Sequence, residues 1–251
     1  MKSEDNKMYH IGLSKEDIKG AKFAILPGDP GRVEKIAEHL DDAQKLTVSR
    51  EYTSYLGKIE DEYVLVISTG MGGPSTAICV EELAKIGITN LIRVGTCGGM
   101  QQDVKAGDIV VATGAIRAEG TSKEYLPVEY PAIADIDLVD SLRLACSDLG
   151  LRYHTGVVHC KDSFYGQHDP DRMPAGYELK DKWKAWIMGG ALASEMETAS
   201  LYTVASTLRL KAAAVLLVIW NQERNDNDSN FDVDREIKVA IKAIENLVGS
   251  N

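Results

Sequence analysis

The 251-residue sequence predicts a single α/β domain whose largely parallel sheet is covered by helices. Two observations carry this prediction. Apolar segments rich in branched residues alternate along the chain with segments of helical periodicity. The apolar segments are also nearly continuous, as in strands that are buried on both faces. No internal repeat or low-complexity linker divides the sequence, so residues 1–251 are expected to form one domain.

Several segments are predicted to be buried strands, because branched apolar residues dominate over a strand-like length. They are residues 22–27, 63–69, 90–96, 108–113, 154–160 and 211–220. Other segments are predicted to be helices from the spacing of their apolar residues. They are residues 32–40, 75–87, 137–150, 177–190, 194–209 and 233–248. Trp183 and Trp186 have helical spacing and are expected to pack in the core.

The composition restricts the partners and the compartment. A net charge of −10 argues against binding to nucleic acid or to an anionic membrane surface. The four cysteines lack metal-binding spacing and are expected to be reduced thiols. Residues 1–17 are too polar for a signal peptide, and no apolar run reaches membrane-spanning length. We therefore expect a cytoplasmic protein that binds neither nucleic acid nor membrane.

The polar segment 224–234 is expected to be a loop, and its acidic residues resemble those of a calcium-binding loop. Phe231 stands where such a loop needs a glycine, and Ile237 stands where it needs a bidentate carboxylate. Calcium binding by this loop is therefore excluded.

Glycines and arginines gather where predicted strands end, which is where ligands bind in α/β sheets. Arg32 starts a helix directly after a Gly/Pro turn, and the N–H groups of a helix start suit an anion. Arg93 lies inside an apolar strand, where an unpaired guanidinium is costly. Arg93 must therefore meet a carboxylate of the protein or an anionic ligand, and phosphate is the favoured ligand.

The glycine loop at residues 70–75 lies between a strand and a helix, as in dinucleotide-binding proteins. However, Ser75 occupies the third glycine position of the G-x-G-x-x-G pattern, and no acidic residue ends the next strand. NAD binding is therefore rejected. The glycines still allow close approach of a smaller group to the backbone.

Two carboxylates, Glu195 and Glu197, precede a strongly apolar segment, although carboxylates are seldom buried without partners. One interpretation is a helix start, with Ser194 as the N-cap and the acids in the first turn. The other is that one carboxylate faces a polyhydroxylated ligand. The residues alone leave both interpretations open.

The segment 161–174 combines aromatic residues with polar residues in a loop that follows a predicted strand. Phe164, Gln167 and Arg172 belong to it, and such a loop can stack on a flat heterocycle and form hydrogen bonds with it. Cys97 has no base fixed beside it in the sequence and is expected to be a small buried hydrophobe. His10 lies in a polar segment, where a surface position is expected.

Several strings occur together and in order along nearly the whole chain. They are LPGDPGRVEKIA, REYTSYLG, STGMGGPST, EELAKIGITNLIRVGTCGG, DSFYGQ and SEMET. In these strings the chain resembles the hexameric nucleoside phosphorylase family. The resemblance implies one α/β domain around a mixed, barrel-like sheet flanked by helices, assembled as a homo-hexamer (a trimer of dimers) with active sites shared between neighbouring subunits.

The resemblance also implies the site residues. Phosphate would be bound by Gly28, Arg32, Arg93 and Thr96, with Arg50 from a neighbouring subunit. Ribose would be bound by Glu195, Met196 and Glu197, with His10 from that neighbour. The base would contact Cys97, Gly98, Phe164 and Gln167. Arg93, Glu197 and His10 would be the catalytic residues, and Glu51, Met71 and Ser75 match a site for a monovalent cation such as potassium at the dimer contact.

The activity implied is phosphorolysis of uridine to uracil and ribose 1-phosphate, with inorganic phosphate as co-substrate and no organic cofactor. The residues for base recognition depart from the family pattern at two places. Gln222 stands where an arginine is usual, and Arg224 follows two residues later. A second base-reading arginine is also displaced, and Arg172 is the nearest candidate for it. Purine-specific relatives have an aspartate near this point, whereas this chain has Asn221 and Gln222. A purine or broader-specificity nucleoside phosphorylase remains the alternative.

Overall fold

A computed structural model describes residues 6–224, 226–227 and 232–249. Residues 225 and 228–231 of the predicted polar loop lie outside the described residues. The strands are β1 (Phe23–Pro27), β2 (Asp41–Ser49), β3 (Tyr52–Ile59), β4 (Glu62–Ile67), β5 (Asn90–Gly99), β6 (Ile109–Ala118), β7 (Ala132–Ile133), β8 (Tyr153–Lys161), β9 (Ala193–Glu195), β10 (Lys211–Asn221) and β11 (Asp226–Asn227). The helices are α1 (Gly31–Ala37), α2 (Gly73–Ile86), α3 (Thr121–Tyr125), α4 (Ile136–Asp148), α5 (Phe164–His168), the 3-10 helix η1 (Pro170–Arg172), α6 (Gly176–Met188), α7 (Thr198–Thr207) and α8 (Asp234–Val248).

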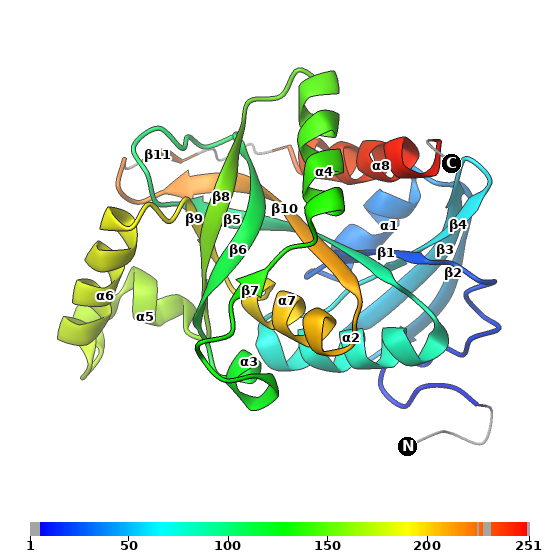
Figure 1. Ribbon diagram of the computed structural model, residues 1–251, viewed down its shortest axis with the longest axis horizontal. Coiled ribbons are helices and arrows are strands. Elements are labelled where there is room, and N and C mark those ends of the chain that lie inside the picture. The colour runs from blue at the N-terminus through cyan, green and yellow to red at the C-terminus, as the bar shows by residue number, and fades with distance from the viewer. Residues whose placement is uncertain (1–5, 225, 228–231, 250–251) are drawn as a thin grey trace.

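A closed barrel forms one end of the sheet. Its strands pair in the cyclic order β5, β10, β6, β8 and β9, and β9 returns to β5. The pairs β5–β10, β6–β8 and β8–β9 are parallel, whereas β10–β6 and β5–β9 are antiparallel. Beyond β5, the sheet continues through β1, β4, β3 and β2, which lie to the right in Figure 1. The expectation of a mixed, barrel-like sheet is confirmed.

The expectation of a largely parallel sheet is wrong, because several strand pairs are antiparallel. β3 is antiparallel to both β2 and β4. Only Glu60 and Asp61 separate β3 from β4, and a connection this short can make only a hairpin. β2 was also not predicted, since most of its residues are exposed and it lacks an apolar run.

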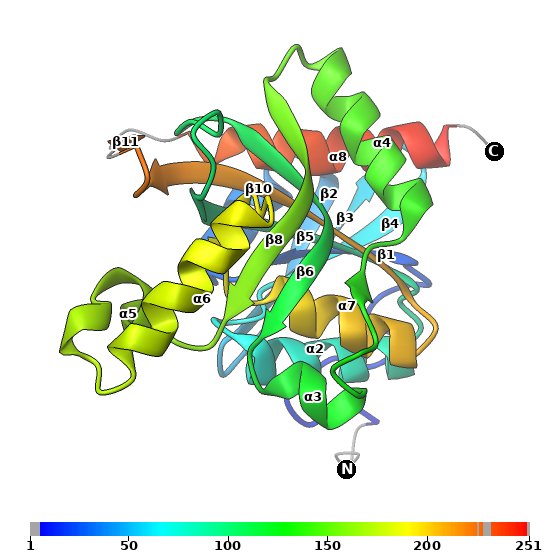
Figure 2. The same ribbon diagram turned by 60° about the vertical axis from the view of Figure 1, so that its left-hand side comes forward.

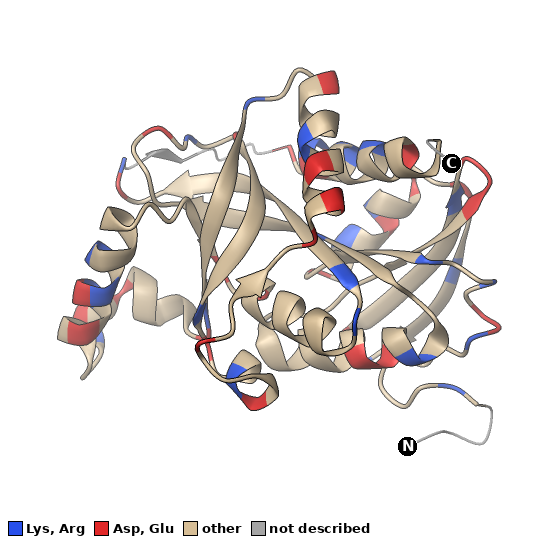
Figure 3. Ribbon diagram, viewed as in Figure 1, with Lys and Arg blue, Asp and Glu red and all other residues tan. Residues whose placement is uncertain are grey.

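Helices cover the sheet in two groups. α2, α3 and α7 lie on one side, and α4 and α8 lie on the other (Figure 1). Two clusters of buried apolar side chains fill the spaces between these layers and the strands. α5 and α6 stand apart at the end of the barrel, and Figure 2 shows α6 beside β8 with α5 farther to the left. In Figure 3 the barrel strands carry few charges, whereas α6 carries many.

The cysteines agree with the prediction of reduced thiols: Cys79, Cys97, Cys146 and Cys160 are free and buried. No helix among the described residues is both long and apolar enough to cross a membrane.

Candidate active site

The site begins where β1 ends beside Arg93 of β5. These strands are parallel neighbours, with Leu26 opposite Arg93 and Pro27 opposite Val94. The turn after β1 therefore lies beside Arg93. A Cβ atom added to Gly28 would lie 3.9 Å from Arg93 Nη1 and 3.2 Å from the carbonyl oxygen of Gly70. A larger side chain at Gly28 would crowd this turn, so glycine lets the turn approach the guanidinium closely.

Arg93 is only 4% exposed and forms two ion pairs inside the protein. Its Nε donates to Glu195 Oε2 at 3.1 Å, and its Nη2 donates to Glu197 Oε2. Burial disfavours the charged form, but Glu197 and Glu195 outweigh it and raise the pKa of Arg93. Nη1 has no hydrogen-bond partner among the described residues. Arg93 thus meets protein carboxylates at one edge and keeps unpaired N–H donors beside Gly28.

Glu195 supports the backbone of the site. In addition to Arg93, it accepts hydrogen bonds from the backbone N–H groups of Glu197 at 2.9 Å and Thr198 at 3.0 Å. These N–H groups belong to the first turn of α7, where a carboxylate is favoured by the helix dipole. The interpretation of Ser194 as the N-cap is wrong, because Ser194 lies in β9 and the cap position of α7 is Glu197.

Glu197 is 5% exposed and is also paired with protein groups. Its Oε1 accepts from the backbone N–H of Gly72 at 2.6 Å, and its Oε2 accepts from Arg93. Gly72 has a φ of 90°, a left-handed conformation that glycine adopts without strain. Glu195 therefore serves the helix start, as the first interpretation expected, whereas Glu197 turns toward the glycine loop. The second interpretation, a carboxylate that faces a polyhydroxylated ligand, stays a prediction. Met196 between them is partly exposed.

Arg32 has a buried partner that the sequence did not reveal. Its Nη1 lies 3.9 Å from Oε1 of Glu236, and neither oxygen of Glu236 has a hydrogen-bond partner among the described residues. Glu236 is fully buried on α8, and this burial raises its pKa to about 8. The spacing of apolar residues in α8 gave no indication that the side chain of Glu236 would be buried among them. Thr96, the last predicted phosphate residue, lies on β5 and is partly exposed.

The predicted base residues gather at the carboxyl end of β5. Gly98 faces Trp220, whose Cε3 would lie 3.9 Å from an added Cβ. The ring of Phe164 lies 4.2 Å from that of His168, which lies 5.0 Å from Trp220. Burial raises the pKa of Cys97, so this thiol is a poor nucleophile, as expected.

Gln167 and Arg172 have different surroundings. Gln167 Oε1 accepts a hydrogen bond from Ser194 Oγ at 2.7 Å, which fixes the orientation of its amide. Arg172 forms an ion pair with Asp169 at 2.8 Å, and its side chain is 60% exposed. Within the described part of the chain, Arg172 forms no recorded hydrogen bond with the other predicted base residues.

Two residues that the sequence reasoning missed lie beside Gln167. Lys161 and His159 are buried at the end of β8 and both contact Ser194 Oγ. A lysine at a strand end is usually exposed to solvent, so the residue type gave no indication that Lys161 is buried. The only signal is its place directly before the DSFYGQ string. Trp183 and Trp186 were expected in the core, but they are partly exposed and pack on His159.

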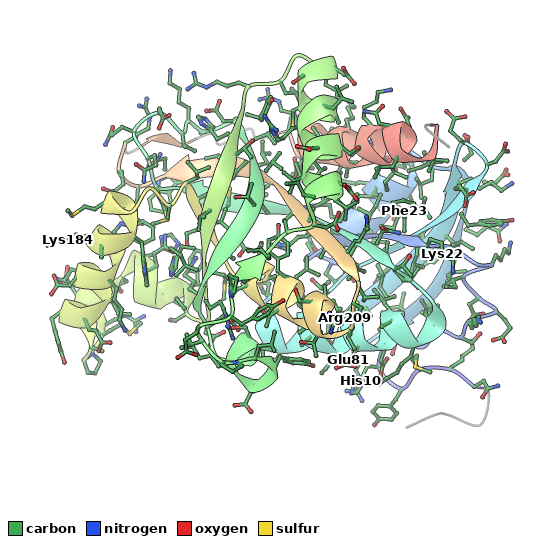
Figure 4. All side chains as sticks on the ribbon, viewed as in Figure 1. His10, Lys22, Phe23, Glu81, Lys184 and Arg209 are labelled. Atoms are coloured by element: carbon green, nitrogen blue, oxygen red, sulfur yellow. The ribbon has the colours of Figure 1, made fainter. Side chains whose placement is uncertain are left out.

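His10 and Arg50 lie in a second group. His10 Nδ1 lies 2.7 Å from Glu82 Oε1, and Glu82 also accepts from the backbone N–H groups of His10 and Ile11. Arg50 is exposed, has a φ of 56° and lies over the ring of Tyr9. Figure 4 shows His10 at the edge of the molecule near the N-terminus. No recorded hydrogen bond joins either residue to Arg93 or Glu197 of the same chain.

The residues of the predicted cation site lie together around Gly70. An added Cβ there would lie 3.0 Å from Glu51 Cγ and 3.1 Å from Ser75 Oγ. Ser75 Oγ also donates to the carbonyl oxygen of Met71 at 3.3 Å. A carboxylate, a hydroxyl and a carbonyl are oxygen ligands of the kind that a hard cation prefers.

The fold is an α/β domain with a mixed barrel, and an arginine, two carboxylates and glycine turns lie together at its strand ends. The chain belongs to the family described as "Phosphorylase superfamily", whose sequence profile matches residues 22–249. A uridine phosphorylase of Treponema pallidum (strain Nichols) is 51% identical over 244 residues, covering 96% of this chain and 94% of that protein.

Other relatives cover as much of the chain. A uridine phosphorylase of Escherichia coli (strain K12) is 37% identical over 248 residues, covering 96% of this chain and 98% of that protein. A guanosine phosphorylase of Halorubrum lacusprofundi is 37% identical over 252 residues, covering 96% of this chain and 99% of that protein.

Proposed function

We propose that this protein cleaves uridine with inorganic phosphate, giving uracil and ribose 1-phosphate. One observation carries the proposal: Arg93 holds Glu197 with one edge while its Nη1 keeps unpaired donors beside Gly28. The same guanidinium can therefore bind a phosphate oxygen and orient the carboxylate that contacts the sugar. Charge-assisted hydrogen bonds of this kind contribute about 1.5–3 kcal/mol each, enough to hold an anion on an acidic protein.

The chemistry follows from these positions. A phosphate oxygen attacks C1′ as the C1′–N1 bond breaks, and the electron pair of that bond leaves with the base. Arg93 and Arg32 align the nucleophile, which lowers the barrier by proximity and orientation. An ionised carboxylate has about four acceptor positions, and Glu197 uses two of them on Gly72 and Arg93. The others suit the 2′- and 3′-hydroxyl groups of ribose, and the negative charge stabilises the developing cation at C1′.

Uridine is favoured as the nucleoside for two reasons. The relatives from Treponema pallidum and Escherichia coli are named uridine phosphorylases. In addition, Asn221 is fully buried and donates to the carbonyl oxygens of Gln101 and Val104, so it does not act as an acid on a purine. The relative named guanosine phosphorylase keeps a purine or broader specificity as the second candidate.

A homo-hexamer built as a trimer of dimers, with sites shared between subunits, is part of the proposal. His10 and Arg50 would then serve the site of a neighbouring copy, which agrees with their lack of recorded hydrogen bonds to Arg93 or Glu197 of their own chain. Large apolar side chains next to them are exposed and could be covered by that copy. They are Tyr9 at 50%, Val48 at 60% and Met71 at 85%.

A monovalent cation such as potassium fits the group of Glu51, Met71 and Ser75. One chain supplies a carboxylate, a carbonyl and a hydroxyl, and Tyr52 donates to the carbonyl oxygen of Ser75 at 2.9 Å and so fixes this segment. A second copy facing the first would complete the ligands. The cation would supply positive charge between two acidic subunits. We also infer that the protein acts in the cytoplasm, since its thiols are free.

The test follows the absorbance of uridine with and without phosphate, and then that of inosine and thymidine under the same conditions. We expect cleavage of uridine only when phosphate is present. Cleavage that ignores phosphate would overturn phosphorolysis in favour of hydrolysis. Faster turnover of inosine than of uridine would overturn the pyrimidine assignment.

A further inference from the structure

Lys161 is a buried cation that the chemistry described so far does not use. It is the last residue of β8 and is 7% exposed. Its Nζ donates to Ser194 Oγ at 2.9 Å, which is the one hydrogen bond recorded for it among the described residues. An ammonium group carries three N–H donors, so two remain available. Burial lowers the pKa of Lys161, and the nearby Glu195 carboxylate opposes this and favours the charged form.

The hydrogen-bond donors around Ser194 can be assigned. Ser194 has one hydroxyl hydrogen, and it is directed to Gln167 Oε1 at 2.7 Å. His159 Nδ1 lies 3.0 Å from the same oxygen and must therefore be the donor in that contact. Burial lowers the pKa of His159 to about 3, so the imidazole is neutral. Lys161 is consequently the cation of this group, and Ser194 links it to the amide of Gln167.

The group lies at the end of the barrel assigned to the base. Ser194 is opposite His159 of β8 and opposite Gly98 of β5. The ring of His159 stacks on Trp186 of α6 at 4.1 Å. Lys161 is therefore bonded to a residue that lies opposite Gly98 and that also bonds to Gln167.

Neither arginine proposed from the sequence supplies a buried positive charge there. Arg172 is paired with Asp169 and is 60% exposed. Arg224 is exposed, and its Nη1 donates to the carbonyl oxygen of Gln102 at 2.6 Å. Arg117 on the neighbouring β6 is buried as well, but its N–H groups donate to Ser122 and to carbonyl oxygens of the segment that follows β6. Lys161 is therefore the buried cation with N–H donors left for a ligand at this end of the barrel, among the described residues.

We propose that Lys161 donates a hydrogen bond to a carbonyl oxygen of uracil and stabilises the negative charge of the base as it leaves. The inference rests on the proposed function. As the C1′–N1 bond breaks, its electron pair moves to N1 and is delocalised onto the carbonyl oxygens, while a phosphate oxygen forms the new bond to C1′. Lys161 keeps its proton, and the uracil anion takes one from water after release. Ser194 holds the Gln167 amide in register with the same base.

The test compares Lys161→Met with the unmodified protein on uridine and on 5-fluorouridine, both with phosphate. Removal of a donor from a developing anion lowers kcat/KM by about 100-fold or more, so this loss is expected for uridine. Fluorine already stabilises the leaving anion, so the loss for 5-fluorouridine should be about tenfold smaller. The KM for phosphate should stay unchanged, because Arg93 and Arg32 bind it. Lys184→Met, an exposed change on α6 (Figure 4), is the matched control and should behave as the unmodified protein.

A binding measurement keeps the test valid if Lys161→Met turns over too slowly. The unmodified protein should bind 5-nitrouracil, which is largely anionic at neutral pH, more tightly than uracil, and Lys161→Met should lose this preference while Lys161→Arg keeps it. If Lys161→Met does not fold, Lys161→Gln takes its place in both measurements. Equal losses for both nucleosides, or an unchanged preference for the anion, would overturn the role of Lys161 while leaving phosphorolysis intact. If the unmodified protein does not cleave uridine with phosphate, the proposed function fails, and this inference fails with it.

Discussion

The carboxylate of Glu195 accepts a hydrogen bond from Arg93 Nε at 3.1 Å and thereby connects the centre of β5 to the start of α7. Glu195 therefore has a structural role, because its oxygens accept hydrogen bonds from Arg93 and from the backbone N–H groups of Glu197 and Thr198. Glu195 thus holds Arg93 and the start of α7 in place, and in the proposed reaction it acts through Arg93 and Glu197.

Replacement of Glu195 by glutamine should weaken both stability and turnover. Loss of one partner of a buried ion pair costs about 3–5 kcal/mol in comparable proteins, and a displaced Arg93 misaligns the nucleophile. Thermal unfolding and kcat/KM for uridine measure the two effects. Glu62→Gln is the control, since Glu62 is exposed on β4. A Glu195→Gln protein with unchanged Tm would contradict the structural role of Glu195.

Arg93→Ala should impair phosphate use most strongly. The substitution removes the donor beside Gly28 and leaves two buried carboxylates without their cation. We expect kcat/KM for phosphate to fall by several orders of ten, and each tenfold loss corresponds to about 1.4 kcal/mol of transition-state stabilisation. Initial rates over a range of phosphate concentrations measure this loss. A change confined to the KM for uridine would place the phosphate elsewhere.

Glu197→Gln should distinguish between sugars. The proposed contact is with the ribose hydroxyls, and 2′-deoxyuridine lacks one of them. Glutamine also replaces a charged acceptor with a neutral one, so turnover of uridine should fall more than turnover of 2′-deoxyuridine. Parallel kinetics on both nucleosides measure the difference. Equal losses would show that Glu197 does not contact the 2′-hydroxyl.

Glu236 should make stability depend on pH. Its pKa rises from 4.5 to about 8 in the folded protein, so the folded state holds the proton more tightly than the unfolded chain between these values. Stability should therefore fall as pH rises through this window and level off above it, by on the order of 2–4 kcal/mol. Glu236→Gln should match the unmodified protein at pH 4.5 and unfold at a higher temperature at pH 8.5. Glu245→Gln, on the same helix but partly exposed, should leave the pH dependence unchanged.

Shared active sites can be tested by mixing two inactive proteins. Arg50→Ala and Arg93→Ala alter residues that the proposal assigns to different subunits of one site. When the two are unfolded together and refolded, about a quarter of the sites should combine an intact Arg50 with an intact Arg93. Activity should then return toward that fraction of the unmodified value. No recovery, with oligomers still formed, would mean that each chain supplies both residues to its own site.

The sequence located the strands around Arg93 better than the segments near Ser194, for physical reasons. β1 and β5 contain apolar runs, so the turn at Gly28 and the position of Arg93 inside a strand could be located from the pattern alone. β9 has only three residues and exists because it closes the barrel, a long-range pairing that no local pattern indicates. The assignment of Ser194 as a helix cap failed for that reason, and Lys161 was missed because its hydrogen bond is to Ser194 of that strand.

The isolation of α5, η1 and α6 has a consequence for divergence within the family. These helices pack mainly against one another, and the aromatic contacts of His159 and Trp220 are among their links to the barrel. Arg93 and Thr96, the proposed phosphate residues, lie on a central strand that pairs on both sides. The segment proposed to cover the base can therefore change by mutation without disturbing that strand. Such independence would allow lineages with a common reaction to acquire different base preferences.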